Sequence, residues 1–189
     1  MRRSTLLNKS KSIILNNHIV DNILNNTLTT IIMPVTNKNL YSANDILYCK
    51  ESVYVVPLSI AVEFEKKNNI ERTSFDETYS YYYTEKILDL NDFSGVVKSN
   101  TKNNCRCFIK VTKSVLCNTD YITDDIAKSL GFENKKELAK SYNSYIKYYL
   151  DMTCKNECQK VNLFKNIYQF NKNPDIQLVS FERLESSDE

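Results

Sequence analysis

The residues best suited to chemistry are six cysteines and a single histidine. Two close pairs stand out, Cys105-x-Cys107 and Cys154-x3-Cys158. A structural zinc site usually pairs one C-x2-4-C knuckle with another, and His18 is the only histidine, so we predict no metal site. In the alternating run CRCFIKV the first pair falls on one strand face, where reduced thiols pack as small apolar residues. The second pair lies in a polar stretch, and its role stays open.

Common catalytic motifs are absent from the sequence. It contains no phosphate-binding G-x-x-x-x-G-K-[ST], no G-x-S-x-G and no H-E-x-x-H, and any nucleophile–histidine pair would have to use His18. His18 lies beside Asn17 on a predicted short helix, and we interpret it as an ordinary surface or half-buried histidine. We therefore predict no catalytic residue and no cofactor.

Some basic and aromatic side chains are candidates for contact with a nucleic acid. Arg106, Lys110 and Thr112 share one face of an alternating strand and could contact phosphates, although an ordinary exposed face explains them equally well. The run YSYYY at 79–83 could stack on bases, but packing on a sheet is the more common role of a Tyr-rich strand. Because the net charge is only +2, charge alone does not identify a nucleic-acid binder.

Composition and length favour one folded domain. With 189 residues and 42% hydrophobic residues, the chain can bury its own core. Lys outnumbers Arg 20 to 5, and there are 23 Asn and 13 Tyr against 2 Gly. This bias is typical of an AT-rich genome rather than of a low-complexity function. No leader-like apolar segment and no membrane-spanning run is found, so we expect a soluble, cytoplasmic protein with no membrane partner.

The elements that must position these residues divide the chain as follows. A basic flexible tail at 1–10 precedes a single domain at 11–185, and 186–189 form a second tail. Within the domain, a helix is predicted over 17–25, followed by a β-branched run at TLTTIIMP. Strands are predicted in NDILYCKESVYVVP, CRCFIKVTKSVLC and DIQLVSFERL. Residues 63–104 are predicted to be a long excursion with a short strand at SYYYTEKI, and 151–173 a polar loop.

A two-helix insert is predicted near 123–150. Thr123 is a suitable N-cap, and Gly131 provides the left-handed position that ends the first helix. Asn134 then caps a second helix, with Glu137 at capping-box spacing. An apolar stripe on this second helix comprises Leu138, Tyr142, Tyr145 and Tyr149. Strands that bracket two helices, after an N-terminal helix, predict an α+β domain built on a curved mixed sheet or a small β-barrel.

Four stretches, in order, resemble those of a known family. IILNNHIVDNILNNTLTT is similar to a helix that runs into a Gly-x-Lys-Thr-x-Thr-Arg turn, and YSANDILYCKES to a Gly-Asp-x-Leu-Trp-Val-Arg-Glu-Thr segment. CRCFIKVTKSVLCNTDYITDDIAKSLGF is similar to a strand followed by Ile-Thr-x-x-Asp-Ala-x-x-Glu-Gly. NKNPDIQLVSFERL is similar to an Asn-Pro-x-Val-x-Val-x-Phe ending. The chain thus resembles, over 11–185, the ASCH domain, a PUA-like β-barrel, and most closely the small ASCH-like proteins of phages and prophages.

The resemblance implies an RNA or nucleotide partner. Aligning the family turn places Leu28 at the lysine and Ile31 at the threonine that act, with a glutamate, in family members that hydrolyse acetylated cytidine. Leucine cannot serve as base, nucleophile or phosphate clamp. We therefore expect a non-enzymatic binding module of viral or mobile-element origin. The residues expected to contact the nucleic acid are Thr29, Thr30, Tyr48, Lys50, Glu51, Arg106 and Lys110.

Two alternatives stay open at this point. One is a hydrolase or ribonuclease that acts on modified nucleosides, which would need a base in the cleft, brought there for instance by Lys38 or Arg72. The other is a degenerate barrel that serves protein–protein contacts. An apolar cleft formed by Leu28, Ile31 and Ile32, without a basic rim, would favour this second alternative.

Overall fold

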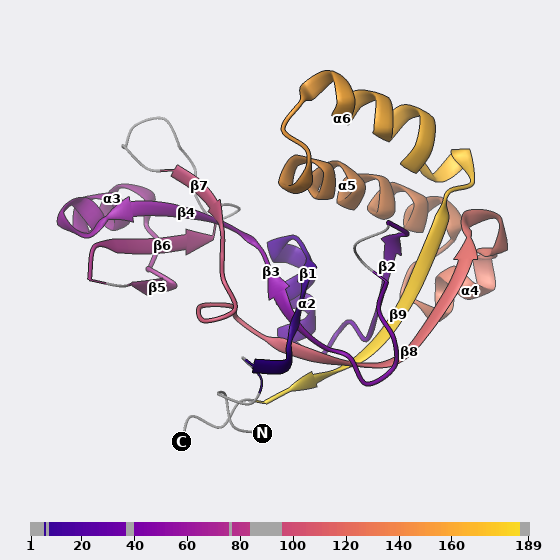
Figure 1. Ribbon diagram of the computed structural model, residues 1–189, viewed down its shortest axis with the longest axis horizontal. Coiled ribbons are helices and arrows are strands. Elements are labelled where there is room, and N and C mark those ends of the chain that lie inside the picture. Colours follow the sequence, from indigo (N-terminus) through magenta and orange to yellow (C-terminus); the bar gives the residue numbers. More distant parts are fainter. Residues whose placement is uncertain (1–5, 7, 37–39, 76, 84–95, 186–189) are drawn as a thin grey trace.

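The computed structural model describes residues 6, 8–36, 40–75, 77–83 and 96–185. Within these residues the chain is an α+β protein with two separate sheets, joined at Glu51, where the chain passes from a strand of the first sheet into a strand of the second (Figure 1). The predicted fold class is therefore confirmed. The strands do not close into the expected small barrel, because each sheet has free edges.

The first sheet has the order β1-β3-β8-β9-β2. Its strands are β1 (Lys11–Ile14), β2 (Thr30–Pro34), β3 (Ile46–Lys50), β8 (Phe108–Asn118) and β9 (Asp175–Leu184). The sheet is mixed, because β1 pairs with β3 in parallel and the other pairs are antiparallel. A register shift between Val111 and Lys113 interrupts the long β8–β9 pair, as a β-bulge does where a sheet bends. The predicted alternation across Thr112 therefore breaks.

The second sheet has the order β5-β6-β4-β7 and is antiparallel. Its strands are β4 (Ser52–Pro57), β5 (Ser74–Phe75), β6 (Tyr79–Tyr83) and β7 (Val96–Ser99). The 3-10 turn Leu58–Ile60 and helix α3 (Ala61–Asn68) follow β4. Much of the predicted excursion at 63–104 is therefore ordered as helix and sheet. The strand expected at SYYYTEKI is confirmed up to Tyr83, and its remainder lies outside the described residues.

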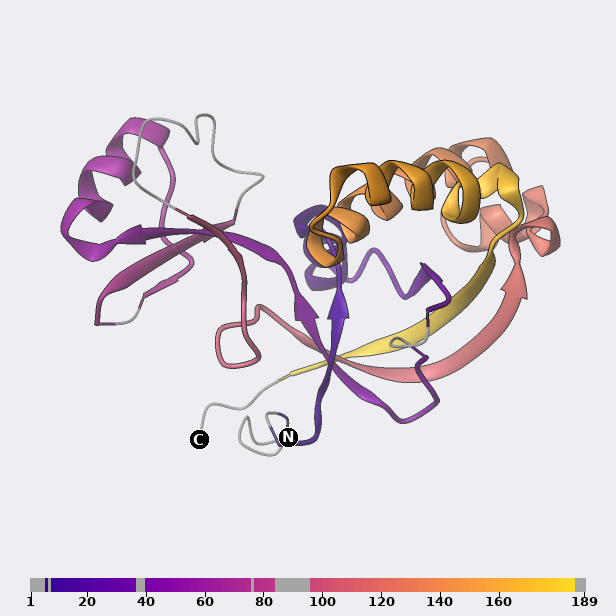
Figure 2. The ribbon, with the colours of Figure 1, turned by 45° about the horizontal axis from the view of Figure 1, so that its top comes forward.

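Helices cover the concave side of the first sheet. They are α2 (Asn17–Leu24), α4 (Asp124–Ser129), α5 (Lys135–Thr153) and α6 (Glu157–Leu163). Figure 1 shows α5 over the concave side of β8 and β9, with α6 on the side of α5 away from the sheet. In the tilted view of Figure 2 the second sheet with α3 stands apart from this helical layer. The apolar stripe predicted on α5 is buried, and it packs into one continuous core with strand residues such as Ile109 and Val179.

Local capping chemistry sets the helix ends as predicted. The side chain of Asn16 accepts from the amide of Ile19 at 2.8 Å, and Thr123 accepts from Ile126 at 3.3 Å. Gly131 ends α4 at φ +88°, and the amide of Phe132 donates to the carbonyl of Ala127 at 3.0 Å in a Schellman arrangement. Where glycine is lacking, asparagine takes the left-handed position, at Asn26, Asn44, Asn69 and Asn173.

Two further expectations are corrected by the structure. The segment 151–173 is mostly helical rather than a polar loop, since α5 runs to Thr153 and α6 is followed by the π-helical turn Phe164–Tyr168 and the 3-10 turn Phe170–Lys172. Asn156 caps α6, accepting from Gln159 at 3.0 Å. The predicted tail at 1–10 is not entirely flexible, because Leu6 is fully buried against Cys105 and Phe108. The tail at 186–189 lies outside the described residues.

Candidate ligand cavity

A cavity of about 150 Å³ lies between α2, β2 and the α4–α5 turn. Its walls are mainly apolar, with Leu28, Ile31 and Ile32 from the β2 side and Phe132 and Leu138 from the helices. The chain turns at Asn26, whose φ of +56° directs the segment from α2 into β2. This turn is the one that resembles the family turn, and it places Leu28 and Ile31 in the wall.

Six of the lining side chains carry a polar group: His18, Asn22, Thr30, Ser141, Tyr142 and Tyr145. The Tyr142 hydroxyl is buried and has no hydrogen-bond partner among the described residues. Burial raises the pKa of Tyr142, so the hydroxyl keeps its proton at neutral pH and can donate. An unsatisfied buried donor is costly, and the side chain that carries this one forms part of the cavity wall.

Charge is scarce at this cavity. Among the described residues that line it there is no Lys, Arg, Asp or Glu, and His18 is the one imidazole. Thr30 Oγ1 lies 3.0 Å from Ser180 Oγ, so its hydroxyl is already paired. The lining therefore favours an uncharged ring with a hydrogen-bonding edge over a phosphate.

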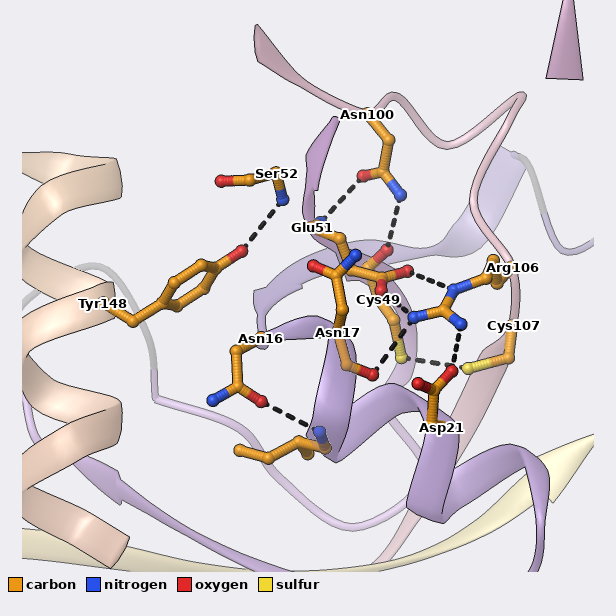
Figure 3. Close-up of polar contacts among 11 residues, drawn as sticks. Asn16, Asn17, Asp21, Cys49, Glu51, Ser52, Asn100, Arg106, Cys107 and Tyr148 are labelled. Carbon is orange, nitrogen blue, oxygen red and sulfur yellow. Dashed lines mark hydrogen bonds and ion pairs between the residues drawn. The ribbon is translucent and has the colours of Figure 1, made fainter. Parts of the chain in front are cut away.

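A buried charge cluster lies at the joint between the two sheets (Figure 3). Glu51, between β3 and β4, is 0% exposed, and Arg106 Nε donates to its Oε2 at 3.1 Å. Arg106 Nη2 also pairs with Glu51 Oε1 and donates to the carbonyl of Asn17 at 3.1 Å. Arg106 Nη1 pairs with Asp21 of α2, and the guanidinium carbon lies 4.0 Å from the centre of the Tyr83 ring.

The energetics of this cluster oppose any role for Arg106 at a phosphate. Burial alone would lower the pKa of Arg106, but Glu51 and Asp21 outweigh burial and the net shift is upward. Releasing the guanidinium to a ligand would leave Glu51 buried without a cation. The cluster is therefore a structural joint.

Further polar contacts hold the backbone around this joint. The Asn100 side chain accepts from the amide of Glu51 at 3.0 Å and donates to the carbonyl of Cys49 at 3.3 Å. The amide of Ser52 donates to the Tyr148 hydroxyl of α5 at 2.9 Å. Figure 3 shows these contacts on both sides of the charge cluster, so the joint ties α2, α5 and both sheets together.

The structure separates the residues predicted to bind nucleic acid. Thr30 alone among them lines the cavity. Glu51 and Arg106 pair with each other, and Lys110 Nζ lies 3.3 Å from Glu182 on the neighbouring strand. The carbonyl of Thr29 accepts from the amide of Phe181. Tyr48 packs near Leu6, and Lys50 is half-buried at the end of β3.

Sequence reasoning overlooked most polar residues of the cavity. His18 and Asn22 are four residues apart on α2 and so lie on one face. This spacing could have predicted that they line the same site. Tyr142 was identified only as part of an apolar stripe. Of the two cations expected to bring a base to the cleft, Arg72 pairs instead with Glu65 at 2.6 Å, and Lys38 lies outside the described residues.

Within the described ranges, no group of three or more His, Cys, Asp or Glu residues is arranged to hold a metal ion. No described helix combines the length and apolar character needed to cross a membrane. Comparison of the chain with protein-family models, with curated proteins and with solved structures finds no match. The cavity and the charge cluster are therefore the basis for a functional proposal.

Proposed function

We propose that the protein is a non-enzymatic binding module whose cavity between α2, β2 and α5 accepts one uncharged heteroaromatic ring, the base of a nucleoside or of single-stranded RNA. The observation that carries this proposal is the lining, which is apolar at Leu28, Ile31 and Ile32 and has a buried, unpaired hydroxyl at Tyr142. Apolar walls with a few fixed polar groups are typical of small-molecule sites.

The size of the cavity limits the ligand to a single ring system. Apolar cavities of about 150 Å³ accept a benzene-sized molecule. A pyrimidine is close to this size and adds an edge of hydrogen-bonding atoms, for which the polar side chains of Asn22 and Ser141 in the lining are candidate partners. The ring would enter the cavity while sugar and phosphate stay outside.

The resemblance to the ASCH domain supports the same class of ligand, and its departures support the lack of catalysis. Leu28 and Ile31 stand in the wall where the family places its lysine and threonine. Without these groups the described lining has no lysine and no carboxylate to activate its hydroxyls at Thr30, Ser141 and Tyr142, and His18 is its one candidate base. The salt-dependent phosphate contacts first expected from Arg106 and Lys110 are disfavoured, because both side chains already pair with carboxylates.

A second candidate is favoured by the same lining. Leu28, Ile31 and Ile32 form an apolar wall with no described basic rim, as expected of a cleft that accepts an aliphatic or aromatic side chain of a partner protein. Such a side chain would leave the Tyr142 hydroxyl without an acceptor. The heteroaromatic ring therefore accounts for more of the lining.

A methyl-detected NMR titration tests the proposal. The probes are cytidine, uridine and adenosine, their 5′-monophosphates, and toluene. We expect a nucleoside to shift the methyl signals of Leu28, Ile31 and Leu138 saturably. Its affinity should not change with salt or with the 5′-phosphate, because no cation of the described lining faces the ligand.

Matched variants locate the binding. Ile31→Trp fills the cavity and should abolish the shifts, whereas Val161→Trp, at an exposed position of α6, should leave them unchanged. If toluene shifts these methyls and no nucleoside does, the protein-contact candidate is correct instead. If none of the probes shifts them, both candidates are wrong.

A further inference from the structure

Two buried cysteine thiols face each other across neighbouring strands of the first sheet. Cys49 is the last residue but one of β3, and Cys107 directly precedes β8. Continuing the register from the pair Tyr48↔Phe108 places the two cysteines directly opposite. The amide of Cys49 donates to the carbonyl of Cys107 at 3.2 Å, and the two Sγ atoms are 3.2 Å apart.

This arrangement meets the backbone requirement for a disulfide. Opposed residues of a hydrogen-bonded antiparallel pair have Cα atoms about 5.5 Å apart. Disulfides span Cα separations of about 4.4–6.8 Å, so the strands need not move to admit a bond. The sulfur atoms already touch, and only their approach to bonding distance, about 2 Å, is required.

The two thiols differ in access. Cys49 is fully buried, and contact with the Cys107 thiol together with burial raises its pKa. Cys107 lines a hollow of about 340 Å³ that is also lined by Arg106 and Arg183. Cys105 lines the same hollow, but Cys107 is the thiol there that contacts Cys49, so oxidation of Cys107 by a small oxidant would leave Cys49 beside it as the second thiol.

We propose that Cys49 and Cys107 form a site of reversible disulfide formation driven by hydrogen peroxide. Cys107 Sγ attacks one peroxide oxygen, the O–O bond breaks, and Cys107 becomes a sulfenic acid while one water leaves. Cys49 Sγ then attacks the Cys107 sulfur, the S–O bond breaks, and a second water leaves. The two thiols lose two electrons and two protons, and the peroxide is reduced to two waters. A dithiol reductant restores both thiols.

The cross-link would close the loop that carries the second sheet. All of β4, β5, β6 and β7, with α3, lies between Cys49 and Cys107 in the chain. The thiols therefore stand where this insert leaves the first sheet and returns to it, next to Glu51 and Arg106. A bond here ties the two ends of the insert together, which restricts the unfolded chain more than the folded one.

Tryptic mapping of the full chain distinguishes this bond from its alternatives. Cleavage after lysine and arginine separates Cys49 in peptide 39–50, Cys105 in peptide 103–106 and Cys107 in peptide 107–110. After brief treatment with hydrogen peroxide and alkylation under denaturing conditions, we expect peptide 39–50 linked to peptide 107–110. Dithiothreitol should release the pair.

Variants make the test independent of the other thiols. Cys154→Ser with Cys158→Ser removes the pair outside the first sheet and should leave the linked peptides unchanged. Cys49→Ser should leave Cys107 as a sulfenic acid that dimedone traps. The proposal is overturned if peptide 107–110 is alkylated or converted to sulfinic acid without a link, or if peptide 39–50 links to 103–106. The wild-type map decides this even if Cys49→Ser does not fold.

Discussion

The two sheets of the protein bury their apolar side chains in different ways. The first sheet shares one continuous core with α2, α4 and α5, and its ligand cavity lies at the margin of that core. The second sheet has a small cluster on each face, one around Tyr54, Phe64 and Tyr82 and another around Val53, Val55 and Tyr83. Hydrophobic stabilisation grows with buried apolar area, so the second sheet depends more on its polar connections to the first.

Those connections are concentrated at the joint around Glu51. There the cation of Arg106 meets carboxylates from two elements, and Tyr148 of α5 reaches the first residue of β4. The first sheet would keep its core if this joint failed, whereas the second sheet would lose its anchor. The following substitutions test this asymmetry.

The largest effect is expected from Arg106→Met. It leaves the Glu51 carboxylate buried without its cation, and breaking a buried pair in this way costs about 3–5 kcal/mol. Urea unfolding of the variant should show this loss. Adding Glu51→Gln should recover part of it. Lys110→Met is the control, because the Lys110–Glu182 pair is exposed and contributes about 1 kcal/mol or less. If Arg106→Met lowers the free energy of unfolding no more than the control does, the charge cluster does not stabilise the joint.

The substitution Phe64→Ala tests whether the second sheet can unfold while the first sheet stays folded. Removing a fully buried phenylalanine costs about 3–5 kcal/mol, and Phe64 is central to the α3 side of this sheet. Hydrogen exchange should show lost protection in β4 and β6 and retained protection in β8 and β9. Val62→Ala, at an exposed position of the same helix, should change neither. Equal loss of protection in both sheets would mean that they unfold as one unit.

Tyr142→Phe is expected to change protein stability and ligand affinity in opposite directions. It removes a buried hydroxyl that has no described partner, so the ligand-free protein should gain about 1 kcal/mol while nucleoside affinity falls. Tyr145→Phe is the matched control. Its hydroxyl donates to the carbonyl of Ile14 at 2.8 Å, so its removal should cost about 1 kcal/mol. Melting curves with and without cytidine measure both effects.

The smallest effect concerns acid pH and the second sheet. The hydrogen bond from Arg72, with a further one from Tyr82, lowers the pKa of Glu65. A lowered carboxyl pKa stabilises the fold above the unfolded value of about 4.3, and this contribution is lost as pH falls through the lower folded value. Glu65→Gln should cost about 1 kcal/mol or less at pH 7, because solvent screens the pair. The same difference persisting at pH 2 would exclude this linkage.

Local chemistry explains what the sequence could predict. The caps at Thr123, Gly131 and Asn134 involve neighbours a few residues away, so their residue types indicate the helix ends directly. The stripe on α5 was predictable for the same reason, because 3.6-residue spacing places it on one face. The segment 151–173 was misread because its apolar residues are sparse and a π-helical turn breaks their spacing.

Long-range pairing explains what the sequence could not predict. Alternation places Arg106 on a strand face but does not reveal that Glu51, 55 residues away, buries it. Closure into a barrel likewise depends on which edges meet, and the edges β1 and β2 do not pair. Of the expected binding residues only Thr30 reaches the cavity, since the others are defined by partners distant in sequence.

The second sheet departs from the first at Lys50 and comes back beside it at Cys107. The 56 residues between these points, 51–106, are about the size of a small domain, and the segment leaves and rejoins the first sheet at neighbouring positions. A segment attached in this manner can be inserted, replaced or deleted during evolution without breaking the pairing of β3 with β8. Relatives of this chain could then share the helical half and its hollow while carrying an unrelated appendage, or none, at the same point.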